Sequence, residues 1–162
     1  MTSQQAIAAP VQSSITVQVS APRAFEVFTA GIDSWWPRSH HIGPSPMTRT
    51  CIEQRAGGRC YSEQEDGTEC TWGTVLEWEP PRRFVMAWQI TPAWKFEPDL
   101  GKSSEVEVRF TPVGNNATRV DLERRHLERH GDGAEAMRKA VGAPNGWPGL
   151  LSMFAERANQ SR

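Results

Sequence analysis

Two side chains at the end of an alternating apolar stretch have the chemistry to hold a polar ligand. Val120 and Leu122 alternate with polar residues, and Arg124 and His126 continue the same parity. Side chains alternate between the two faces of a strand, so a strand that runs this far would aim both groups at the buried face. There they would orient the polar end of a ligand, because buried polar groups need partners. The alternative is that the strand ends near Glu123 and that both groups lie in water.

A second polar set lies earlier in the chain. Arg59, Tyr61 and Glu63 alternate and would share one face of a strand. Tyr61 is therefore a further candidate anchor for a ligand. The alternative is an exposed face with an Arg–Glu ion pair, which contributes less than about 1 kcal/mol to stability. For an enzyme, His126 and Glu63 are the candidate titratable groups, and either would need a perturbed pKa inside a cavity.

The sequence offers little to a metal ion or to nucleophilic catalysis. His40 and His41 are adjacent and would point apart, so they fit better at the mouth of a cavity than around one ion. His126 and His130 would share a face only on a helix. The sequence has no metal-motif spacing of cysteines or carboxylates, no G-x-S-x-G motif and no glycine-rich phosphate loop. We therefore predict no metal, no cofactor and no catalytic residue, and keep an enzyme as an alternative.

Two neighbouring predicted strands carry apolar residues that could surround a ligand. Pro80-Pro81 joins them, and each has apolar side chains at alternate positions. The first set is Trp72, Thr74, Leu76 and Trp78, and the second set is Phe84, Met86, Trp88 and Ile90. Because alternate residues of a strand share one face, the two sets predict a tryptophan-rich wall.

The C-terminal segment predicts one long helix with an apolar stripe. Its apolar residues are Trp147, Leu150, Leu151, Phe154, Ala155 and Ala158, spaced as one face of a helix requires. This stripe must pack on the concave face of the sheet. A cavity between helix and sheet would then be walled by Trp72, Leu76, Trp88, Trp147, Leu151 and Phe154. The same tryptophans would also serve a solid core without a cavity.

The order of elements predicts an α+β domain. One strand comes first, two short helices follow, then several antiparallel strands and the long helix. Helices segregated from strands are typical of this class. We expect residues 1–13 to be a flexible tail and residues 14–162 to form one domain, with a curved antiparallel sheet wrapped around the C-terminal helix.

Composition argues against several functional classes. Eighteen Lys and Arg residues balance nineteen Asp and Glu residues, a formal net charge of −1, whereas nucleic-acid binders usually show a basic excess. Three cysteines without a C-x-x-C pair predict free thiols in a reducing compartment. We identify neither a signal peptide nor a membrane span and expect a cytoplasmic protein.

Four segments resemble one protein superfamily in their order and spacing. They are VQVSAPRAFEVFT at 17–29, WGTVLEWEPPRRF at 72–84, SEVEVRFTPVGNNATRVDLE at 104–123 and GWPGLL at 146–151. Over residues 15–157 the chain resembles the SRPBCC (START/Bet v 1-like) superfamily, and within it the homologues of the activator of the heat-shock protein 90 ATPase. The resemblance implies a helix-grip fold around a cavity. The eukaryotic activators carry an additional N-terminal domain that contacts the chaperone, whereas about fourteen residues precede the first predicted strand here.

The first hypothesis from the sequence is a small cytoplasmic protein that binds a hydrophobic small molecule in an apolar cavity. The alternatives are a chaperone-interacting module and an enzyme acting on a cavity-bound substrate, because one fold hosts many functions. The oligomeric state is not indicated. Trp35 and Trp36 would mark a dimer patch if exposed, or would close the mouth of the cavity.

Overall fold

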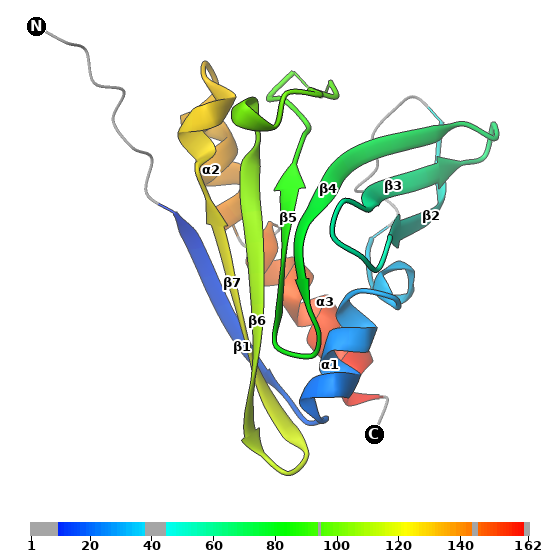
Figure 1. The fold of residues 1–162 in the computed structure, drawn as a ribbon, viewed down its shortest axis with the longest axis vertical. Coiled ribbons are helices and arrows are strands. Elements are labelled where there is room, and N and C mark those ends of the chain that lie inside the picture. The colour runs from blue at the N-terminus through cyan, green and yellow to red at the C-terminus, as the bar shows by residue number, and fades with distance from the viewer. Residues whose placement is uncertain (1–9, 38–44, 94, 144–145, 161–162) are drawn as a thin grey trace, which may run out of the picture.

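An antiparallel sheet bends around the C-terminal helix (Figure 1). The computed structural model describes residues 10–37, 45–93, 95–143 and 146–160. Within these residues the sheet has seven strands in the order β1-β7-β6-β5-β4-β3-β2. The strands are β1 (Val11–Val17), β2 (Met47–Ile52), β3 (Arg59–Gln64), β4 (Glu69–Glu79), β5 (Arg83–Trp88), β6 (Ser104–Gly114) and β7 (Ala117–Arg125). Apart from the step between β1 and β7, sheet neighbours are also neighbours in the chain.

The helices lie at the two ends of the chain and in its turns. They are α1 (Ala21–Phe28), η1 (Ile32–Ser34), η2 (Leu100–Lys102), η3 (Leu127–His130), α2 (Ala134–Gly142) and α3 (Trp147–Asn159). The Ser20 side chain accepts a hydrogen bond from the Arg23 N–H and caps α1, as its place before Pro22 predicts. Two short helices after the first strand and a long final helix confirm the predicted α+β helix-grip fold. Within the described residues, none of the helices has the length and apolar character that a membrane crossing requires.

The first strand begins earlier than the sequence suggested. β1 starts at Val11, which pairs with Arg124 of β7. Residues 11–13, which we assigned to the tail, therefore belong to the sheet. This pairing continues along the whole of β1 and places it at one edge of the sheet.

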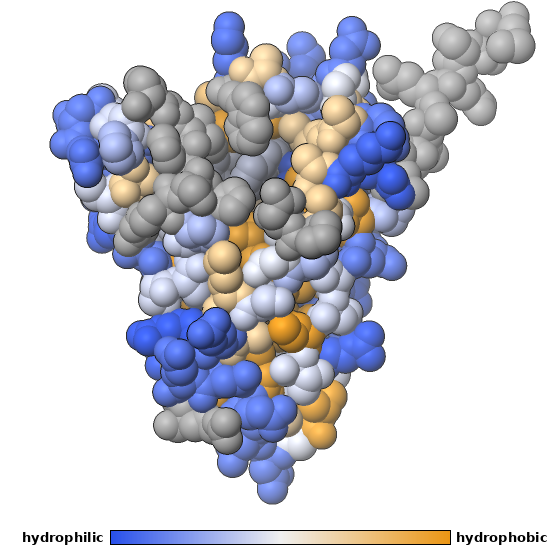
Figure 2. All heavy atoms as spheres, turned by 180° about the vertical axis from the view of Figure 1, so that it is seen from behind, coloured by the Kyte–Doolittle hydropathy of each residue, from blue (hydrophilic) through white to orange (hydrophobic). Residues whose placement is uncertain are grey.

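The core fills the concave side of the sheet, against α1 and α3. The predicted stripe of α3 is confirmed, since Trp147, Leu150, Leu151, Phe154, Ala155 and Ala158 are all buried. Phe154 is fully buried and its ring lies 5.0 Å from that of Phe28 on α1 and 5.7 Å from that of Trp35. Figure 2 shows the molecule from behind, with hydrophobic residues through the middle of that face and hydrophilic ones gathered at its margins.

Two bulges in β4 change which of its residues face the core. Cys60 pairs with Gly73 but Tyr61 pairs with Thr71, so Trp72 is an extra residue in β4. A second irregularity makes Leu76 an extra residue, because Val75 pairs with Met86 and Glu77 pairs with Val85. Each bulge shifts the alternation of the strand by one position.

The predicted shared face of Trp72, Thr74, Leu76 and Trp78 is therefore wrong. Trp72 is in the core and Trp78 packs against it. Between these two residues the side chain that enters the core is that of Val75, which is fully buried. Thr74 bonds to the Gln89 side chain instead, at 2.6 Å. On β5 and just after it the prediction is confirmed. Phe84 and Met86 of β5 and Ile90 beyond its end are in the core, and Trp88 packs against it.

Candidate functional site

Four tryptophans meet at one end of the core and form what we call the tryptophan cluster: Trp36, Trp72, Trp88 and Trp147. The rings of Trp36 and Trp72 are nearly parallel, with centroids 6.1 Å apart. Trp147 packs against Trp36 at 5.9 Å, and Trp88 against Trp72 at 5.4 Å. Trp72 comes from β4, Trp88 from β5 and Trp147 from α3, so strands and helix converge here. Trp36, Trp72 and Trp147 are buried, and Trp88 packs against the core.

Three of the predicted cavity walls are brought together in this cluster, and the others are not. Leu151 and Phe154 lie further along α3 in the buried core. Leu76 lies in the second bulge of β4, half-buried and outside the core cluster, so its predicted place in the wall is not supported. Trp36 was not predicted as a wall. It is 8% exposed and Trp35 is 6% exposed, which contradicts an exposed dimer patch at these residues.

Arg124 lies next to the tryptophan cluster, in contact with Trp88. Among the described residues it is the largest fully buried side chain, only 1% exposed, and its guanidinium carbon lies 4.7 Å from the centroid of the Trp88 ring. Its Nε donates a hydrogen bond to Ser104 Oγ at 2.9 Å, and one terminal nitrogen lies 3.6 Å from Met137 Sδ. Among the described residues no carboxylate forms an ion pair with this cation.

This burial is costly for a charge. Desolvation lowers the pKa of Arg124 from 12.5 to about 9, so the side chain still carries its charge at neutral pH. Buried charges are usually paired, because moving an ion out of water costs several kcal/mol. The face of Trp88 offsets part of this cost by a cation–π interaction, worth about 2 kcal/mol when desolvated. The site therefore holds a positive charge that the described residues do not neutralise.

Ser104 links Arg124 to a histidine that the sequence did not single out as a site residue. Ser104 Oγ lies 2.7 Å from His130 Nε2. Because arginine can only donate, Oγ accepts from Arg124 and its own hydrogen points to Nε2. The Ser104 backbone N–H also approaches Nε2, at 3.3 Å. The ring hydrogen is thus assigned to Nδ1, which is buried and has no partner in the described part of the chain.

His130 is held neutral by this arrangement. Burial, and after it the charge of Arg124, lowers the pKa of His130 from 6.5 to about 4. The chain brings His130 back to β6 because β7 ends at Arg125 and His126 takes a left-handed conformation with φ 61°. Non-glycine residues rarely adopt this conformation, so the sequence pattern does not predict that the chain reverses direction at His126.

The other predicted polar residues lie away from this site. The His126 side chain is 41% exposed, and its Nδ1 lies 3.7 Å from a Glu128 oxygen. Tyr61 lies on the outer face of β3, under the Arg59 guanidinium at 4.2 Å. Glu63 pairs with Arg49 at 2.6 Å on the same face. For His126, Tyr61 and Glu63 the surface alternative therefore holds, whereas for Arg124 it does not.

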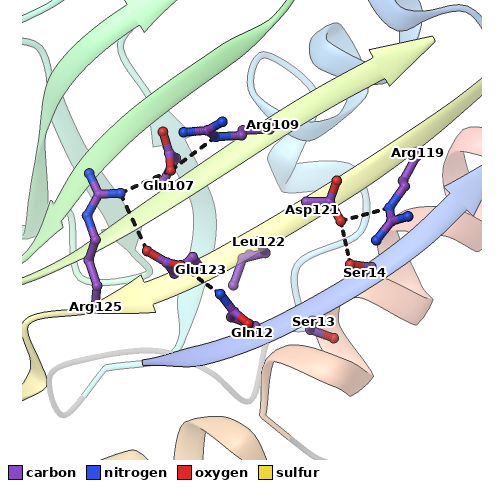
Figure 3. A pocket seen from close by; sticks show the side chains of 10 residues that line it. All are labelled: Gln12, Ser13, Ser14, Glu107, Arg109, Arg119, Asp121, Leu122, Glu123 and Arg125. Carbon is purple, nitrogen blue, oxygen red and sulfur yellow. Dashed lines mark hydrogen bonds and ion pairs between the residues drawn. The ribbon is translucent and has the colours of Figure 1, made fainter. Parts of the chain in front are cut away.

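A groove lies on the outer face of β1, β7 and β6 (Figure 3). This groove encloses about 470 Å³ and is lined by acidic and basic side chains. They neutralise one another: Glu107 contacts Arg83, Arg109 and Arg125, while Asp121 contacts Arg119. Burial acts to raise the pKa of Glu107, but Arg109 and Arg83 outweigh it and hold the pKa below its ordinary value. The groove presents no uncompensated charge to a ligand.

No metal site emerges from the described side chains. Among them, no three or more histidine, cysteine, aspartate or glutamate residues gather as a metal ion requires. His40 and His41, predicted at the mouth of a cavity, lie outside the described residues. Cys51, Cys60 and Cys70 are free thiols.

A bent sheet gripping a long helix, with aromatic side chains and a buried cation between them, defines a helix-grip protein with a ligand-binding fold. Residues 18–159 match the family model described as Activator of Hsp90 ATPase homolog 1-like protein, and the chain belongs to this family. This confirms the predicted SRPBCC membership. Comparison with curated protein sequences gives no match.

Solved structures extend the comparison. The chain is 42% identical to an anthrahydroquino-gamma-pyrone synthase, Txn09, over 93% of this chain and 97% of that one, with a TM-score of 0.66. It is 31% identical to the self-sacrificing resistance protein CalC from Micromonospora echinospora, over 94% and 95% of the two chains, with a TM-score of 0.67. Protein NE0264 from Nitrosomonas europaea, 16% identical over 94% and 96% with a TM-score of 0.66, shows the fold alone.

Proposed function

We propose that this protein binds a hydrophobic aromatic small molecule at the tryptophan cluster, with an oxygen of the ligand on Arg124. The observation that carries the proposal is a fully buried guanidinium beside Trp88 with no carboxylate partner among the described residues. An oxygen of a ligand would accept from the guanidinium N–H groups for which the described residues provide no acceptor. Flat indole faces beside it suit an aromatic ring system.

The comparisons favour a ligand of this kind. The 42% identical protein is named as an anthrahydroquino-gamma-pyrone synthase, and such a product is a flat, fused aromatic system with several oxygens. Pockets for small molecules are typically apolar with few, well-placed polar groups, and the tryptophan cluster with Arg124 and Ser104 has that composition. We therefore place hydroxylated polycyclic aromatics first among ligand classes, ahead of lipids and sterols.

Titration of tryptophan fluorescence tests the proposal. The panel contains a hydroxyanthraquinone, a chromone as a simple gamma-pyrone, a fatty acid and a sterol, each added to the purified protein. We expect quenching and a rise in melting temperature with the aromatic compounds, since a ligand at 100 times its Kd adds about 2.7 kcal/mol of stability. No quenching and no thermal shift with any of the aromatic compounds would refute this proposal.

A catalytic role is the second candidate, and the observation that favours it is the 42% identity to a protein named as a synthase. Its test is incubation with ortho-hydroxyaryl diketones, whose hydroxyl oxygen can attack the distal carbonyl and close a gamma-pyrone ring with loss of water, followed by absorption and mass spectrometry. Ring closure faster than in buffer, and slowed in Arg124→Met, would support it. Closure at the buffer rate would count against it.

The chaperone alternative has only the family's description behind it, because no surface of the described residues is marked out for such a partner. Adding the protein to a heat-shock protein 90 and measuring ATP turnover decides it.

A cytoplasmic location is part of the first proposal, and the three free thiols support it, since reducing compartments keep cysteines unpaired. Cell fractionation would check the location.

A further inference from the structure

The charged residues near Arg124 lie on the outer face of the sheet, whereas its neighbours on the concave face are uncharged. Its neighbours on the concave side are Trp88 of β5, Ser104 of β6, Met137 of α2 and His130, and Val11 pairs with it from β1. Burial alone shifts the pKa of Arg124, with no contribution from a carboxylate. The acids next to it in the sheet face the other way and are paired. Glu123 of β7 and Glu105 and Glu107 of β6 all form ion pairs with Arg125 on the outer face.

A ligand group on Arg124 would therefore meet a full positive charge in a water-poor site. Opposite charges within about 4–6 Å favour the ionised form of an acid, by about one to three pKa units. His130 does not compete for the proton, because its Nε2 already accepts from Ser104 and its pKa is about 4. A proton released by the ligand would go to solvent.

The hydrogen-bond donors of Arg124 that can still bind a ligand favour one class of acid. Ser104 gives its hydroxyl hydrogen to His130, so it offers no donor to a ligand, and the guanidinium is the charged donor of the site. A guanidinium binds a carboxylate best through two parallel hydrogen bonds, but here Nε and one terminal nitrogen already contact Ser104 and Met137. A phenolate or enolate presents a single oxygen and spreads its charge over the flat ring that carries it. Such a ring can lie against the indoles while its oxygen meets Arg124.

Resting on the proposed function, we infer that the ligand carries an acidic phenol or enol and is bound as its anion, with the ionised oxygen on the guanidinium of Arg124. The inference assigns a chemical class to the ligand and a role to Arg124, that of selecting and holding the ionised form. Ser104 and His130 are positioning residues: Ser104 accepts from Arg124 Nε and is itself held by His130.

Alizarin, a dihydroxyanthraquinone whose visible spectrum changes when its phenol ionises, is a direct probe. Its absorption is recorded with and without excess protein across the pH range in which free alizarin ionises. We expect the apparent pKa of the bound dye to fall by about one unit or more, which is an affinity at least about tenfold higher for the anion than for the neutral dye. Arg124→Met should abolish the shift. Arg119→Met, on the same strand but on its outer face, should leave the shift unchanged.

The outcomes separate this inference from the proposed function. If alizarin binds with an unchanged or raised pKa, the inference is wrong and the binding proposal stands. If an anthraquinone carboxylate binds more tightly than alizarin, the phenol or enol class is wrong. If neither dye quenches tryptophan fluorescence, the binding proposal itself is refuted for this class. Arg124→Lys, which keeps a charge, should retain part of the shift, and the wild-type titration decides alone if Arg124→Met does not fold.

Discussion

The guanidinium of Arg124 lies over the indole of Trp88, 4.7 Å from the ring centroid, although β6 separates their two strands in the sheet. Trp88 pairs with Ser104 on β6, and Ser104 Oγ accepts from Arg124 Nε, so the arginine reaches over β6 to the tryptophan. This contact joins the one uncompensated buried cation of the described residues to the tryptophan cluster. It is the relationship on which a ligand site at this end of the core depends.

Replacing Arg124 with methionine should stabilise the protein. Methionine keeps the length and apolar stem while removing a desolvated charge, and such replacements of buried ionic groups often stabilise a protein by about 1–4 kcal/mol. Urea denaturation at neutral pH measures the change. The variant should bind aromatic ligands more weakly than the wild type. A destabilised but folded Arg124→Met would mean that the chain itself compensates the charge, which contradicts the basis of the site.

His130 should make stability fall in mild acid. Its pKa is about 4 in the folded protein against an ordinary value of 6.5, because burial and Arg124 oppose protonation. Below pH 6.5 the unfolded chain therefore binds a proton that the folded chain does not. The stability contributed by neutral His130 is fully present above pH 6.5 and is lost as the pH falls to about 4.

Urea denaturation at several pH values in this window measures the effect. His130→Gln, which removes the titration, should show a smaller loss of stability between neutral and acid pH than the wild type. His126→Gln is the matched control, since that side chain is 41% exposed, and it should follow the wild type. Equal slopes for His130→Gln and the wild type would disprove the assignment.

Trp88 and Trp78 should differ in their effect on ligand binding. Trp88 belongs to the tryptophan cluster, whereas Trp78 packs against Phe25 of α1 at 5.0 Å. Trp88→Leu removes an aromatic face and should weaken binding of a hydroxyanthraquinone by up to about tenfold. Trp78→Leu should lower stability by about 1–3 kcal/mol and leave the affinity unchanged. The reverse pattern in fluorescence titrations would move the site to the α1 end of the core.

Gly73 should tolerate no side chain at the first bulge of β4. A Cβ at this position would lie 2.3 Å from the Ala87 carbonyl oxygen of β5, a backbone atom that can yield only if the strands separate. Gly73→Ala should therefore destabilise the protein by about 1–3 kcal/mol. Gly114→Ala is the control, because its Cβ would meet only Ala117 at 3.9 Å. Thermal melts compare them, and equal melting temperatures would contradict the close approach.

The three thiols should differ in reactivity. Cys60 is fully buried, and burial raises the pKa of its thiol, so little thiolate forms and reagent has no access. Cys51 and Cys70 are partly exposed. Alkylation by iodoacetamide, followed by mass spectrometry, should modify Cys51 and Cys70 in the native protein and Cys60 only after denaturation. Modification of Cys60 at the same rate as the others would show that the core opens readily at β3.

Sequence alone determined the class of fold and the packing face of α3. The stripe from Trp147 to Ala158 was predictable because helical spacing is local, and all six of its residues are buried. Alternation predicted the inward face of β5 for the same reason. The family motifs, spread along the chain, also agreed with the helix-grip fold.

Tertiary structure decided which polar residues share the site. The bulges at Trp72 and Leu76 exist only in the pairing of β4 with its neighbours, so alternation along β4 misplaced Thr74 and Leu76. Arg124 is buried because β7 continues to Arg125, and His130 joins it because the chain reverses at His126. Side-chain direction depends on register and chain reversal, and both are set by contacts between segments far apart in the sequence.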